Sequence, residues 1–172
     1  MRTAGVLAAL AVAIVLQATL SGMSMAGGTR VNLVLVAVVY VALAFGAVTG
    51  LLAGTAGGLA QDALAGGIVG VGGLSKTIVG FLVGVLGAQF IVSQPVPRFV
   101  MFVGATFVHE LCFQALYALV ESRVFTMQYS AVLLQALVNA TIGVLAFQVV
   151  EGTPGLLQRR SSRGAMFSRR RY

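Results

Sequence analysis

The chain has 172 residues, of which 59% are hydrophobic and 9% are charged, and its net charge is +7. Soluble domains devote about a quarter of their residues to Asp, Glu, Lys and Arg, so this composition excludes a soluble domain and indicates an integral membrane protein. The one histidine, His109, and the one cysteine, Cys112, lie three residues apart without an orienting third group. We therefore expect no enzymatic activity, no metal and no cofactor.

Long stretches without charge predict the helices in chain order. At about 20 residues per crossing, we expect an all-α bundle of six membrane spans. Residues 1–150 then form a single transmembrane domain, and residues 151–172 form a flexible, basic cytoplasmic tail that contacts lipid headgroups rather than nucleic acid. A re-entrant third segment is the alternative to six full spans. The predicted spans are 4–21, 31–46, 47–65, 74–93, 98–120 and 128–150.

Glycines recur every four residues through the third span. The second span and most of the third lie in one stretch, residues 31–61, which has 31 residues without a charge. As one helix it would measure about 46 Å against a hydrocarbon core of about 30 Å, so it must fold back. Small residues four apart share a helix face and let another helix approach closely. The predicted packing face consists of Gly50, Gly54, Gly58 and Gly66.

Five polar residues interrupt the apolar pattern at positions where they need partners. Asp62 ends the glycine run on the same side of the membrane as Arg30 and Asn32, which begin the second span. An acid near lipid is costly alone, so we expect Arg30 to pair with Asp62. Glu110 and Asn139 fall in the middle of the fifth and sixth spans. They either form a polar cluster that orders the bundle or contacts a guest helix, or a protonated Glu110 hydrogen-bonds to Asn139 or to a neighbouring hydroxyl.

The basic residues predict that both termini are cytoplasmic, following the positive-inside rule. Pro95 and Pro97 mark the cytoplasmic turn between the fourth and fifth spans. In this topology the outer side of the membrane receives three basic residues, Arg30, Lys76 and Arg123. The cytoplasmic side receives Arg2, Arg98, Arg159, Arg160, Arg163, Arg169, Arg170 and Arg171.

Together these residues resemble the MreD family of rod shape-determining proteins over nearly the whole chain. The resemblance lies in Arg30-x-Asn32, the glycine pattern around Asp62 that ends in Gly70-Val71, and the polar residues Glu110 and Asn139. Two features depart from the family: Val31 stands where many members have proline, and the arginine-rich tail is not a family hallmark. The first departure puts the rigid turn before the second span in doubt.

The resemblance implies a non-catalytic scaffold in the cytoplasmic membrane of a walled bacterium. Such proteins associate with the bitopic protein MreC and, through it, with actin-like MreB filaments and peptidoglycan-elongating synthases. The implied fold is similar to the substrate-binding S components of energy-coupling-factor transporters. That similarity supplies the alternative function, a membrane carrier component for a vitamin or another small molecule.

The residues themselves favour the scaffold over the carrier. A partner helix needs a close-packing groove with polar anchors, and we expect it to dock on Gly50, Gly54 and Gly58. A carrier needs an enclosed pocket with aromatic residues, whereas only 8% of this chain is aromatic. Proton translocation would require acids at successive depths, and only Asp62 and Glu110 qualify. The sequence leaves open whether the chain self-associates and whether a lipid occupies the bundle.

Overall fold

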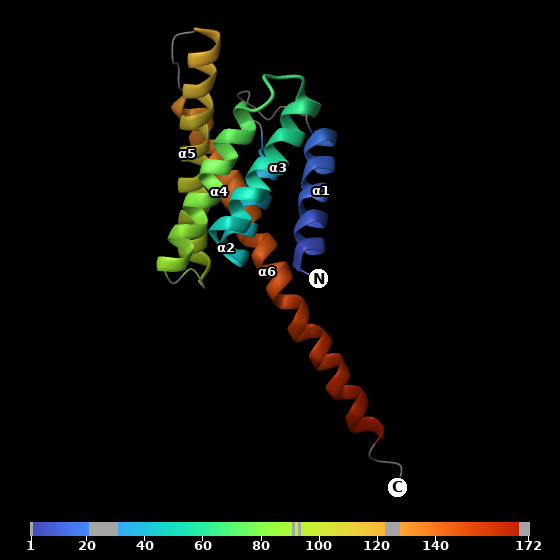
Figure 1. The fold of residues 1–172 in the computed structure, drawn as a ribbon. Helices are drawn as coiled ribbons and strands as arrows, with labels where there is room; N and C mark the ends of the chain where they lie inside the picture. Colours follow the sequence, from blue (N-terminus) through green and yellow to red (C-terminus); the bar gives the residue numbers. More distant parts are fainter. Residues whose placement is uncertain (1, 21–30, 91, 93, 123–127, 169–172) are drawn as a thin grey trace.

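The described part of the chain forms six α-helices and no β-strand in a computed structural model, which describes residues 2–20, 31–90, 92, 94–122 and 128–168. Figure 1 shows the helices running alternately up and down in one bundle. The predicted all-α class is therefore confirmed. The helices are α1 (Arg2–Leu20), α2 (Leu33–Phe45), α3 (Ala47–Ala65), α4 (Val71–Gln89), α5 (Pro95–Glu121) and α6 (Tyr129–Ser168).

Three of these helices are long and apolar enough to cross a membrane. They are α4, α5 and the first 23 residues of α6, Tyr129–Glu151. Ala4–Leu20 of α1 and the whole of α2 are apolar but shorter. α3 is an unbroken helix of 19 residues, as a spanning segment requires. The helices indicate a membrane protein, and the full set of six crossings stays a prediction.

The buried core surrounds α2, which contacts each of the other five helices. Its sequence, LVLVAVVYVALAF, has no charged face, and a helix that is hydrophobic all round belongs inside a bundle. Leu35 and Val39 pack with Val79 of α4, Phe102 of α5 and Ala140 of α6. α2 is therefore the central helix, and the others are arranged around it.

Glycines bring the backbones of α3 and α4 into direct contact. A Cβ atom on Gly50 would lie 2.5 Å from the carbonyl oxygen of Gly80, and one on Gly58 would lie 2.5 Å from the Cα atom of Gly73. Gly54 faces the backbone of α4 in the same way. The expected docking of a partner helix on this face is therefore wrong, because α4 of the same chain already fills the space.

Two glycines with positive φ end helices. Gly66 has a φ of +67° and is the C-cap of α3. The four-residue spacing predicts that Gly66 belongs to the packing face, and this prediction is wrong because the helix ends there. A left-handed residue is the usual way to stop a helix, and glycine adopts it without a steric penalty. Gly46, with a φ of +89°, is the single residue between α2 and α3 and reverses the chain there.

Arg98 joins α5 to α6 at the end of the bundle where α5 begins. Its guanidinium donates two hydrogen bonds to the carboxylate of Glu151, at 2.7 and 2.6 Å, and its Nε donates to the carbonyl oxygen of Val92 at 3.0 Å. The guanidinium also lies 4.3 Å from the centre of the Phe147 ring. This two-point geometry is the strongest form of an arginine–carboxylate contact, and it fixes how the two helices meet.

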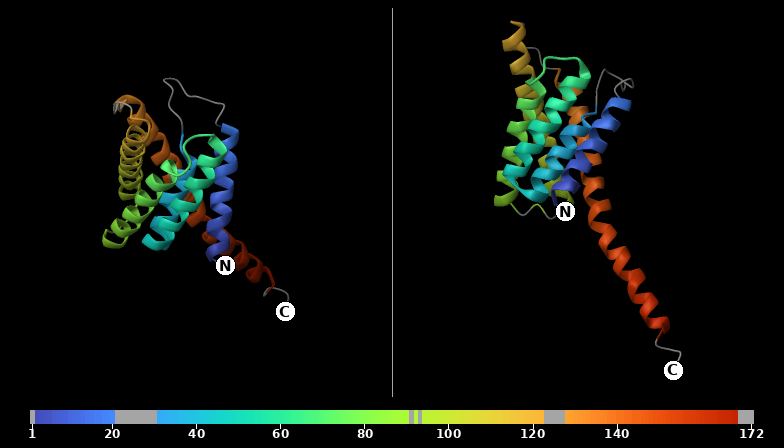
Figure 2. Two further views of the ribbon diagram at one scale, coloured as in Figure 1. Left: turned by 45° about the horizontal axis from the view of Figure 1, so that its top comes forward. Right: turned by 45° about the vertical axis from the view of Figure 1, so that its right-hand side comes forward.

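Two predicted helix boundaries differ from the structure. Pro95 and Pro97 begin α5 rather than forming a turn before it, because the first turn of a helix leaves amide hydrogens unused. The predicted span at 128–150 agrees with the apolar part of α6, Tyr129–Glu151, but the helix itself continues through Pro154 to Ser168. One proline removes only one backbone hydrogen bond, and arginine and leucine after it favour helix. The tail is thus a helical extension that projects from the bundle (Figure 2).

A leucine at Gly58 should force α3 away from α4. Overpacking of a close interface costs about 3 kcal/mol or more in the least tolerant cases, and here the obstacle is backbone. We expect Gly58→Leu to lower the melting temperature of the detergent-solubilised protein or to prevent a monodisperse species. Gly104→Leu is the matched control, because a Cβ atom on Gly104 meets nothing within 4 Å. Equal melting temperatures for the two variants would contradict the interface.

Candidate functional site

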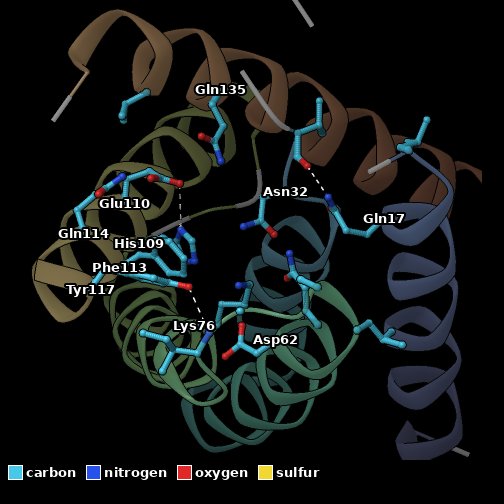
Figure 3. Close-up of a pocket in the computed structure, with 18 of the residues that line it drawn as sticks. Gln17, Asn32, Asp62, Lys76, His109, Glu110, Phe113, Gln114, Tyr117 and Gln135 are labelled. Carbon is cyan, nitrogen blue, oxygen red and sulfur yellow. Dashed lines mark hydrogen bonds and ion pairs between the residues drawn. The ribbon is translucent and has the colours of Figure 1, made fainter. Parts of the chain in front are cut away.

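A cavity of about 780 Å³ lies at the end of the bundle where α3 passes into α4. We call it the polar recess. Asn32, Asp62 and Glu110 line it, so three of the five predicted polar anchors converge there. Arg30 lies outside the described residues. Most of the polar residues of the recess are labelled in Figure 3. The full set is Gln17, Asn32, Gln61, Asp62, Lys76, His109, Glu110, Gln114, Tyr117, Gln128 and Gln135.

Asp62 caps the amino terminus of α4. Its Oδ2 atom accepts hydrogen bonds from the backbone N–H groups of Gly70 and Gly73, at 2.9 and 3.0 Å. The N-cap residue, Gly70, has no side chain for this task. The first N–H groups of a helix carry partial positive charge and lack partners within the helix, so a buried carboxylate is stabilised there. Asp62 is a structural anchor between α3 and α4.

Asn32 and Asn139 belong to one chain of hydrogen bonds between three helices. The Asn139 Oδ1 atom accepts from the backbone N–H of Asn32 at 3.2 Å, and its Nδ2 donates to the hydroxyl of Thr106 at 3.3 Å. Asn32 also caps α2, since its side chain accepts from the N–H of Leu35 at 3.0 Å. The expected Glu110–Asn139 bond is therefore replaced, because Asn139 uses its amide on α2 and α5.

Glu110 faces His109 instead. The Glu110 Oε1 atom lies 3.5 Å from the His109 Nδ1 atom, which is longer than an ordinary hydrogen bond. His109 is 2% exposed and stacks on Phe113 with ring centres 5.7 Å apart. Among the described residues, neither ring nitrogen of His109 has a hydrogen-bond partner. His109 therefore brings two buried nitrogen atoms, unsatisfied within the described residues, to the wall of the recess.

Lys76 is the residue of the recess that sequence reasoning missed. The sequence suggests only an outer topological charge, whereas the structure buries Lys76 to 2% exposure on α4 and directs it into the recess (Figure 3). The available signal was that Lys76 is the single charge between Ala63 and Pro97. An ionisable residue alone inside a membrane segment indicates a functional site by default.

Several polar side chains in the recess already have partners within the protein. The described residues contain no group of three His, Cys, Asp or Glu side chains that could hold a metal ion. Asp62 already has two donors and Asn139 has two partners, so neither is free to act on a substrate. What the recess provides is a set of buried donors and acceptors with an ammonium group among them.

Removing the Asp62 carboxylate should expose its structural role. Loss of a capping side chain costs about 1–2 kcal/mol, so Asp62→Ala should lower the melting temperature in detergent. Asp62→Asn keeps an oxygen that can accept the same hydrogen bonds, and it should lose less stability. The order wild type, Asn variant, Ala variant is the expected ranking. An Ala variant as stable as the wild type would show that the cap does not hold α4 in place.

One comparison with known proteins identifies a family. A family model described as "rod shape-determining protein MreD" matches residues 2–152. The matched region contains α1 to α5 and the apolar part of α6, and with them the whole polar recess. The chain matches no curated protein and no solved structure. Because the family model covers most of its length, the chain belongs to the MreD family of rod shape-determining proteins.

Proposed function

We propose that this chain is a non-catalytic membrane scaffold of the cell-elongation machinery that binds a bitopic MreC-like protein. Through that partner it would link MreB-like filaments to the enzymes that elongate peptidoglycan. Membership of the MreD family carries the proposal, since it assigns the chain to rod shape determination. The apolar helices support a location in the cytoplasmic membrane.

The proposed topology has six spans and both termini in the cytoplasm. In Figure 1 the amino terminus and the start of α5 lie at the end of the bundle from which α6 projects. That end would carry eight of the basic residues, including Arg98 and the arginines after Glu151, as the positive-inside rule requires. The polar recess, at the other end, would then face the outer leaflet.

The polar end of the bundle near Asp62 is the proposed contact for the partner's outer segment. The glycine face is filled by α4, so the partner must use the outside of the bundle. Val69, in the turn that Asp62 fixes, is 63% exposed. A side chain this exposed at the turn can be reached by a second protein, so it can report a contact there. The expected Arg30–Asp62 pair belongs to this end and stays a prediction.

Photo-crosslinking tests the partner and its position together. A photoreactive residue at Val69 should form an adduct with the MreC-like protein in native membranes. The matched control is Phe90, which is 62% exposed at the other end of α4. Stronger crosslinking at Phe90 than at Val69 would overturn the proposed contact. Failure of the MreC-like protein to co-purify with the full-length chain would overturn the scaffold itself.

The second candidate is the carrier component, which the polar recess favours. Its volume of about 780 Å³ falls within the range of small-molecule sites, and Phe113 and Tyr117 supply aromatic surface. A ligand that binds only the folded state raises its melting temperature, by an amount that grows with ligand concentration. A panel of water-soluble vitamins, each at saturating concentration, tests this function. If no vitamin raises the melting temperature, the carrier function is excluded and the scaffold function is favoured.

A further inference from the structure

Charges of both signs line the polar recess (Figure 3). The Lys76 ammonium group interacts electrostatically with the carboxylates of Asp62 and Glu110, which line the same cavity. The N–H groups of Gly70 and Gly73, at the amino-terminal end of α4, also stabilise the Asp62 carboxylate. An anion in the recess would therefore lie near two carboxylates, and a cation would lie near an ammonium group. A ligand that suits this arrangement carries no net charge.

His109 contributes hydrogen-bonding atoms to the recess without contributing charge. Its side chain is 2% exposed and stacks on Phe113, and burial disfavours the charged form of an imidazole. A neutral imidazole has one nitrogen that donates a hydrogen bond and one that accepts. Within the described residues, neither nitrogen has a partner. His109 therefore offers both a donor and an acceptor to a ligand in the recess.

Gln61 has an unsatisfied acceptor in another wall of the same cavity. Its Oε1 atom is buried and has no hydrogen-bond partner among the described residues. Gln61 belongs to α3 and His109 to α5, so the atoms without partners lie on two different helices around the recess. Buried polar groups are almost always hydrogen-bonded, by protein, water or a ligand. A ligand that satisfies both residues must donate and accept hydrogen bonds, and a hydroxyl group does both from one atom.

Aromatic and amide side chains extend the lining of the recess. The rings of Phe113 and Tyr117 have centres 4.9 Å apart, and the amides of Gln114 and Gln135 lie in the same lining. The carbon face of a sugar ring packs on aromatic rings, while its hydroxyl groups bond to amides and carboxylates. The volume of about 780 Å³ falls within the range of small-molecule sites. The lining therefore suits a ligand with many hydroxyl groups and one apolar face.

We propose that the polar recess binds an uncharged, hydroxyl-rich ligand of the sugar class, with hydroxyl groups on His109, Gln61 and Lys76 and a carbon face on Phe113. The source is either a free sugar or the sugar head of a glycolipid. The inference goes beyond the proposed scaffold and does not rest on it, because residues of this chain alone line the site. Loss of the sugar site should leave co-purification with the MreC-like protein unchanged.

The experiment measures binding to the full-length protein in phosphatidylcholine nanodiscs. The soluble probes are radiolabelled methyl glycosides of glucose, galactose and mannose, and the lipid probe is glucosyl diacylglycerol. Detergents with sugar heads are avoided, because those heads belong to the proposed ligand class. At least one probe should bind saturably to the wild type. In His109→Phe its dissociation constant should rise about 10-fold or more, as expected when hydrogen bonds to a buried ligand are lost.

The variants separate binding from folding. Phenylalanine keeps a flat ring against Phe113 without the unsatisfied nitrogens, so unliganded His109→Phe should be at least as stable as the wild type. If His109→Phe does not fold, Gln61→Met is held to the same expected loss of affinity. Thr141→Val is the matched control, because the Thr141 hydroxyl donates to the carbonyl oxygen of Leu137 on an exposed part of α6, outside the recess. It should keep the wild-type affinity.

Charged sugars test the class of the ligand. The uronic acid and the protonated amino sugar with the same ring as the bound probe should each bind about 10-fold or more weakly than that probe, because each leaves a charge near one of like sign. Equal binding of either charged sugar would overturn the proposal. So would an unchanged affinity in the folded recess variant, or the absence of saturable binding by every uncharged probe.

The same probes distinguish the two sources of the sugar. Saturable binding of a methyl glycoside that displaces glucosyl diacylglycerol would identify a free sugar as a sufficient ligand. Binding of glucosyl diacylglycerol alone, in preference to diacylglycerol without the sugar, would identify a glycolipid head. Equal binding of diacylglycerol with and without the sugar would contradict the role of the hydroxyl groups.

Discussion

The approach of α3 to α4 at backbone distance is the constraint on which the rest of the molecule depends. Glycines on both helices leave only hydrogen atoms between them, so the contact tolerates no side chain. The same approach places Asp62 over the free N–H groups of α4 and fixes the turn between the helices. Lys76, whose backbone packs on Gly54, lines the recess beside Asp62. The contact between α3 and α4 therefore also positions the residues of the polar recess.

Much of the helical framework is predictable from charge alone, because lipid forces an apolar chain into regular helices between its polar breaks. The predicted third span, 47–65, coincides with α3. Spacing also identifies Gly50, Gly54 and Gly58 as a close-packing face. It cannot say which helix fills that face, because a neighbour in the same chain and a partner's helix require the same small residues. The prediction that a partner helix docks on this face is wrong because of this ambiguity.

The polar residues show a similar limit. Depth along a helix brings Asn139 and Glu110 to the same level, but their orientation is set by the rotation of α5 and α6, which depends on packing. Asn139 points at Asn32 and Thr106, and Glu110 at His109. Lys76 was overlooked because a charge near a predicted span end suggests topology first. Polar groups with hydrogen-bond partners join the helices, whereas the buried polar atoms of Gln61 and His109 that have no partner among the described residues lie around the recess.

Gly46 has a consequence for how the chain enters the membrane. As the single residue between α2 and α3, it leaves no loop that could wait at the surface while one helix inserts before the other. α2 is apolar throughout, whereas α3 has four glycines and Asp62 among its buried residues and is a poor candidate for insertion alone. If both helices cross the membrane, as the proposed topology requires, they must enter the lipid together as a hairpin. The most hydrophobic helix of the protein would then carry into the membrane the glycine-rich helix that lines the polar recess.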